Sequence, residues 1–117
     1  MAYVDGFVIP VKTTNKDTYL AMAKKAAEIW KDHGALEVIE CWGDDVSPGK
    51  LTSFPQAVKL EDDETVVFSW VTWPDRQSRD AGNDKVMNDP RMKEMETDMP
   101  FDGKRLIFGG FEVLNKA

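Results

Sequence analysis

The alternation of apolar and polar residues predicts four strands and two main helices, in the order strand, helix, strand, strand, helix, strand. We expect the strands over residues 3–10, 36–42, 65–73 and 104–113. Apolar residues recur every three or four positions across 16–33, which predicts an amphipathic helix, and a more polar helix is expected from 74 to 88. Two strand–helix–strand units indicate an α+β, ferredoxin-like βαββαβ fold with an antiparallel four-stranded sheet.

Every predicted strand is apolar on both faces, whereas right-handed crossovers place both helices over one face. We expect mostly small or branched residues to face the helices, namely Val4, Gly6, Val8, Ile39, Cys41, Val67, Ser69 and Val71. We expect a larger set on the opposite face, namely Tyr3, Phe7, Ile9, Trp42, Phe68, Trp70, Ile107 and Phe111. A monomer usually exposes apolar patches of only a few hundred Å². We therefore predict a homodimer whose sheets pack face to face as a dimeric α/β barrel, with about 2,000 Å² or more buried.

The composition narrows the classes of partner. A length of 117 residues fits a single domain, residues 1–117. The net charge of −6 opposes binding to nucleic acid and to an anionic membrane surface, since both are negatively charged. One cysteine rules out an internal disulfide, and with no signal peptide or long apolar run we expect a cytoplasmic protein.

Five sequence blocks together point to a known family. They are AYVDGF at 2–7, HGA at 33–35, ECWGDDV at 40–46, DETVVFSW at 63–70 and MPFDGKR at 99–105. In this order they resemble the YbaA-like family of small bacterial proteins, a domain family of unknown function, over residues 2 to about 112. The resemblance implies a place in the dimeric α/β-barrel superfamily, which includes cofactor-free monooxygenases, haem-degrading enzymes and small binding proteins. It also implies a ligand between sheet and helices, but it assigns no catalytic residue.

His33 is the only histidine and the first candidate general base, because its ordinary pKa lies close to neutral pH. The alternative is a structural residue in the last turn of its helix, where the helix dipole favours it. A single histidine excludes multi-histidine metal sites, and the acidic stretches at 44–45 and 61–64 lack the spacing of a calcium loop. We therefore expect neither a metal nor a cofactor.

Asp5 and Glu40 are the other candidates for catalysis. Both are expected on the aromatic-rich face, inside the barrel, where a buried carboxylate must be paired or protonated. A raised pKa would make one of them a proton acceptor. We favour the alternative of a structural carboxylate at the dimer interface, with Arg105 as its partner.

Trp30, Trp73 and Arg79 are the candidates for ligand binding. Tryptophans can line a pocket for a planar ligand, and an arginine can hold an anionic group at its rim. The simpler alternatives are core packing for the tryptophans and a surface position for Arg79. Four methionines at 87, 92, 95 and 99 form either an adaptable wall or ordinary core.

Three functions follow from these features. The first is a small-molecule binding protein with its site in the helix–sheet cleft, which a structure without a cavity there would contradict. The second is a cofactor-independent monooxygenase acting on an aromatic substrate, which needs His33, Asp5 or Glu40 beside a pocket. The third is a structural or partner-binding dimer, and the sequence leaves open whether the protein is an enzyme.

Overall fold

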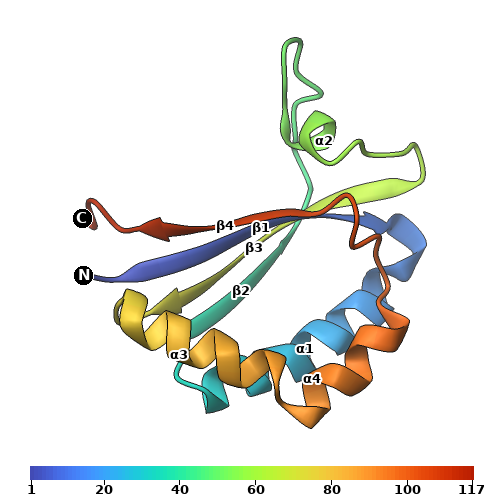
Figure 1. Ribbon diagram of the computed structural model, residues 1–117. Coiled ribbons are helices and arrows are strands. Elements are labelled where there is room, and N and C mark those ends of the chain that lie inside the picture. Colours follow the sequence, from blue (N-terminus) through green and yellow to red (C-terminus); the bar gives the residue numbers. More distant parts are fainter.

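The computed structural model describes residues 1–117 and has an antiparallel sheet in the order β2-β3-β1-β4 (Figure 1). The strands are β1 (Tyr3–Lys12), β2 (Glu37–Trp42), β3 (Glu64–Trp73) and β4 (Ile107–Glu112). The long central strands β1 and β3 pair over their whole length, from Tyr3↔Trp73 to Lys12↔Glu64. This order confirms the predicted α+β class and ferredoxin-like topology, while the pairing of two copies stays a prediction.

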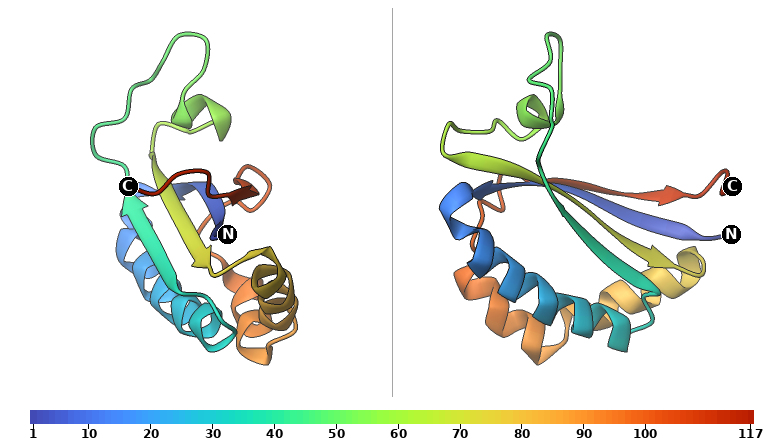
Figure 2. Two further views of the ribbon diagram at one scale, coloured as in Figure 1. Left: turned by 90° about the vertical axis from the view of Figure 1, so that its left-hand side faces the viewer. Right: turned by 180° about the vertical axis from the view of Figure 1, so that it is seen from behind.

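Three helices lie over one face of the sheet and leave the other face without a helical layer (Figures 1 and 2). They are α1 (Lys16–Asp32), α3 (Arg76–Met87) and α4 (Pro90–Met95). Short 3₁₀ turns, η1 (Thr13–Asn15) and η2 (Glu96–Asp98), flank α1 and α4. The remaining helix, α2 (Phe54–Ala57), belongs to the β2–β3 connection, which projects from one end of the sheet as an arm. No helix is both long and apolar enough to span a membrane.

Local sequence explains where the helices begin and how they pack. The Asp75 side chain accepts a hydrogen bond from the Ser78 backbone N–H and so caps α3, and Asp89 caps α4 in the same way through Arg91. Gly82 lies inside α3 because the helix passes closely over a buried ring. A Cβ at this position would be 2.3 Å from Cζ3 of Trp73.

The predicted assignment of strand faces is correct for β3 and β4 but wrong for β1 and β2. Directly paired residues share a face, and Asp5 pairs with Val71 while Glu40 pairs with Ser69. The helix-facing side therefore includes Asp5, Phe7, Ile9, Val38, Glu40, Trp42, Val67, Ser69 and Val71. Val4, Gly6, Val8, Ile39 and Cys41 lie on the other side, here called the open face. The prediction assumed that helices pack tightly on small residues, whereas here α1 packs on the larger Ile9 and Val67, and a cavity separates other parts of the sheet from the helices.

The arm covers one end of the open face. Val58 and Leu60 from the arm pack against Val8 and Val66, and Phe54 meets Phe68 edge to face at 5.6 Å between ring centroids. Further along the face Phe111 from β4 remains 61% exposed. The chain thus covers part of this face by itself, and a second copy would have to cover only the remainder.

Candidate functional site

A cavity of about 470 Å³ lies between the sheet and the three helices. Of its 20 lining residues, 15 are hydrophobic, and the lining is drawn from the sheet, from α1, α3 and α4, and from the chain that follows α4. Phe7, Ile9 and Val71 represent the sheet, and Ala26 and Trp30 represent α1. Interiors are normally filled by side chains, so a void of this size marks a candidate binding site.

Methionines form much of the helical side of the cavity. Five of the six in the chain line it, namely Met22, Met87, Met92, Met95 and Met99. Unbranched thioether side chains change rotamer easily and adapt to the shape of what they contact. Sequence reasoning considered four of these residues and preferred core filling, whereas the structure places them in the cavity wall.

Glu40 of β2 and Tyr19 of α1 form a hydrogen-bonded pair in the cavity wall. The Tyr19 hydroxyl donates to Oε1 of Glu40 at 2.6 Å. Burial raises the pKa of Glu40, although the hydroxyls of Tyr19 and Ser69 act in the opposite direction. Burial and the adjacent carboxylate also raise the pKa of Tyr19. Glu40 keeps accessible surface toward the open cavity, so a protonatable oxygen pair faces the space where a ligand would lie.

Asp5 and Arg79 form the second polar pair in the wall. Arg79, from α3, donates from Nη2 to Oδ1 of Asp5 at 2.8 Å and from Nε at 3.1 Å. Trp73 Nε1 donates to the other carboxylate oxygen at 3.0 Å. The remaining Arg79 nitrogen, Nη1, donates to Asp80 at 2.9 Å, and the guanidinium lies over the Tyr3 ring. Both charges are therefore compensated, and Asp5 is bound too fully to act as a free base.

Asn83 follows Arg79 by one helical turn and lines the same cavity. Its Oδ1 is buried and has no hydrogen-bond partner. Buried polar atoms are nearly always paired, so an orphaned one in a cavity wall is informative. Sequence reasoning missed Asn83 because a polar residue in a polar helix gives no signal. Its four-residue spacing from Arg79 was the only available clue.

The other predicted site residues fall in different places. Trp30 lines the cavity, whereas Trp73 is fully buried behind it, with its ring edge-on to Trp30 at 5.9 Å. His33 lies outside the cavity, where its Nε2 pairs with Oδ2 of Asp89 at 2.8 Å. Arg91 and then His33 lower the pKa of Asp89.

Two predicted side-chain environments are wrong. Arg105 does not pair with Asp5 or Glu40; it donates to Glu64 at 2.6 Å and to Asp102 at 2.9 Å, at the arm end of the sheet. Asp5 and Glu40 do not lie on the open face, where a shared barrel would form, because the register turns both toward the helices. The structure contains no group of three or more His, Cys, Asp or Glu side chains placed to hold a metal ion.

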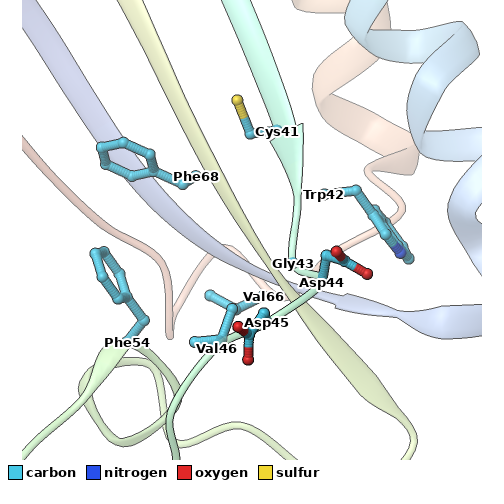
Figure 3. A pocket seen from close by; sticks show the side chains of 9 residues that line it. All are labelled: Cys41, Trp42, Gly43, Asp44, Asp45, Val46, Phe54, Val66 and Phe68. Carbon is cyan, nitrogen blue, oxygen red and sulfur yellow. The ribbon is translucent and has the colours of Figure 1, made fainter.

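A smaller pocket of about 230 Å³ lies on the open face beneath the arm (Figure 3). Phe54, Val66 and Phe68 form its apolar wall together with Cys41, which therefore faces away from the helices and not toward them as predicted. The indole of Trp42 turns to the opposite side of β2 (Figure 3), where Lys16 Nζ lies 5.4 Å from its ring centroid. This pocket carries no basic side chain and no paired polar cluster like that of the larger cavity.

Known proteins resemble this chain in both sequence and fold. A family model described as "Protein of unknown function (DUF1428)" matches residues 2–103. The "Uncharacterized protein YbaA" of Escherichia coli K12 is 57% identical over 114 residues, 97% of each chain, and that of Shigella flexneri matches equally. The structure of Rv0793 from Mycobacterium tuberculosis superposes with a TM-score of 0.57 at 8% identity, covering 100% of this chain and 99% of that one. The predicted family is thereby confirmed, and the structural neighbour supports the fold alone.

Proposed function

The chain belongs to the family described as protein of unknown function (DUF1428), and we propose that it binds a small, largely apolar molecule between its sheet and its helices. The observation that carries this proposal is the cavity of about 470 Å³ with its 15 hydrophobic lining residues. Ligand pockets commonly measure roughly 300–1,000 Å³ and combine an apolar lining with a few polar groups. The pairs Tyr19–Glu40 and Asp5–Arg79 are polar groups of this kind.

A contribution to folding stability does not explain the cavity between the sheet and the helices. An unfilled cavity loses the van der Waals contacts and the apolar burial that a packed core would supply. The methionine wall supports a binding role, because these side chains can close around ligands of different outline. It also counts against a purely structural dimer, which would need no space on the helix side of the sheet.

Fluorescence of N-phenyl-1-naphthylamine, a neutral apolar dye, tests this proposal. We expect enhanced, blue-shifted emission with the wild-type protein. Ala26→Leu places an isobutyl group in the cavity and is expected to weaken dye binding at least about tenfold. The matched control is Ala27→Leu, one residue further along α1 and outside the lining. Equal dye binding by both variants, with folding verified by circular dichroism, would place the dye elsewhere and refute the proposal.

We also propose that the functional unit is a homodimer joined through the open faces of two sheets. In the middle of this face the side chains are uncharged: Glu37 lies at one end, and Lys12 and Glu64 lie at the other. Phe68 and Ile107 are each 44% exposed there, and such a continuous apolar surface on a soluble domain favours pairing with a copy of itself. Sedimentation at micromolar concentration tests this directly, and a stable monomer would contradict it.

One observation favours cofactor-independent monooxygenation of an aromatic substrate as a second candidate function. Glu40 lies in the cavity wall with a raised pKa, so its carboxylate can accept a proton from an acidic phenol. His33 is outside the cavity and Asp5 is held by Arg79, which leaves Glu40 as the accessible base. Oxygen uptake with catechols or naphthalenediols, abolished in Glu40→Gln, would support this function. Wild-type protein that consumes no oxygen with these phenols would leave binding as the function.

A further inference from the structure

The polar groups in the cavity wall differ in whether their hydrogen bonds are already made. The two pairs already described are satisfied: Arg79 donates to Asp5 and Asp80, and the Tyr19 hydroxyl donates to Glu40. An acceptor remains without a partner, since the buried Oδ1 of Asn83 receives no hydrogen bond. This oxygen therefore lacks a donor, and a ligand can supply one.

The charged side chains in the cavity wall also limit which ligands can bind. Arg79 is its only basic lining residue, whereas both Asp5 and Glu40 line it as acids. Arg79 is bound in a two-point pair with Asp5, so an anionic ligand would have to break that pair or approach two carboxyl groups without a free cation. The lining therefore disfavours an anion, contrary to the role that the sequence suggested for Arg79.

We propose that the ligand is a neutral, mostly apolar molecule with a hydroxyl or amine group that donates a hydrogen bond to Oδ1 of Asn83. This inference rests on the proposed binding function and adds the chemical class of the ligand. An apolar body fills the space between the aromatic and methionine side chains. The donor satisfies the one buried oxygen that the protein leaves unpaired. A ligand with a second donor can also reach the Glu40 carboxyl group, which shares the cavity wall.

Three naphthalenes of similar size test the inference on the full-length protein by displacement of N-phenyl-1-naphthylamine. 1-Naphthol offers a donor, 1-methoxynaphthalene offers only an acceptor, and 1-naphthoate is an anion. We expect 1-naphthol to bind at least about tenfold more tightly than the methyl ether, because only the hydroxyl can satisfy the orphaned oxygen. We expect 1-naphthoate to bind most weakly.

Asn83→Leu identifies the acceptor. This variant replaces the amide with an apolar group of similar size, so the preference for 1-naphthol over the ether should fall to less than about threefold while the ether still binds. The control is Asn88→Leu at the end of the same helix, which lies outside the lining and should keep the full preference. If the Asn83 variant does not fold, the ranking of the three compounds on wild-type protein still decides the ligand class.

The outcomes separate the two proposals. If none of the naphthalenes or the dye binds, the binding function itself fails. If the ether binds as tightly as 1-naphthol, or 1-naphthoate binds most tightly, the binding function stands and the donor inference is overturned. If Asn83→Leu retains the preference for 1-naphthol, another group receives the donor and the role assigned to Asn83 is wrong.

Discussion

The two faces of the one sheet are built for different purposes. On the helix side, large side chains and two polar pairs surround a cavity, and α1 packs against β1 and β3 beside it. On the open face, small and aromatic residues form an uncharged middle around Gly6 and Gly109, and Phe111 lies against both glycines. The helix side thus borders an accessible cavity, whereas the open face is an apolar surface that the arm covers at one end.

This difference between the two faces shows where a binding or catalytic site can form: polar side chains line the helix side, and the middle of the open face has no charged side chain. Each acid in the cavity wall has a specific hydrogen-bond donor, Arg79 for Asp5 and Tyr19 for Glu40. Asp5 is buried, and the hydrogen bonds from Arg79 and Trp73 compensate for the cost of that burial. The middle of the open face carries no charge and needs no such compensation.

The largest expected effect is on self-association, when a residue of the open face is changed. Phe111→Asp places a charge on the open face, where the Phe111 ring lies beside Gly6 and Gly109, and should weaken self-association on the order of 10³-fold, measured by sedimentation equilibrium. Leu20→Asp is the control, because Leu20 is an exposed leucine on α1, away from this face. Equal association of both variants would mean that the open face is not the interface.

The next largest expected effect is a loss of folding stability when a polar pair on the helix side is broken. Asp5→Ala leaves the Arg79 guanidinium and the Trp73 indole N–H without their partner and should lower the free energy of unfolding by about 3 kcal/mol in urea titrations. Asp63→Ala removes an acid from an exposed pair with Lys12 and should change it by less than about 1 kcal/mol. Similar losses in both variants would contradict the distinct energetic role assigned to the cavity wall.

The smallest effect contrasts the pH dependence of two glutamates. The pKa of Glu40 is raised by burial, so its contribution to stability is present below the ordinary glutamate pKa and is lost as pH rises through the raised value. The pKa of Glu64 is lowered by Arg105, so its contribution is present above the ordinary value and is lost as pH falls.

Melting temperatures from pH 3 to 8 test this contrast. Relative to wild type, Glu40→Gln should gain stability as pH rises above the ordinary glutamate value. Glu64→Gln should lose stability relative to wild type as pH rises toward that value, with a constant difference above it. Parallel profiles for the two variants would mean that the environments of Glu40 and Glu64 are not opposite in this way.

Part of the candidate site could be predicted from residue types. Asp5 and Glu40 were named together as carboxylates, one of which a raised pKa would make a proton acceptor, and a structural pair with Arg105 was favoured. Burial raises the pKa of Glu40, whereas Arg105 pairs with Glu64. Trp30 and Arg79 were named as ligand candidates, and both line the cavity. Asn83 could not be found in this way, because its significance depends on an absent hydrogen-bond partner.

The amino-acid sequence by itself determined the order of strands and helices, the family and the ferredoxin-like topology, because periodicity and sequence blocks are local properties. It also sorted the residues of each strand into two alternating sets. Only the tertiary structure decided which set of β1 and β2 faces the helices, since that depends on the register between strands distant in sequence. The same register brings Asp5 and Glu40 into the cavity, so the site arises from pairings that no single segment encodes.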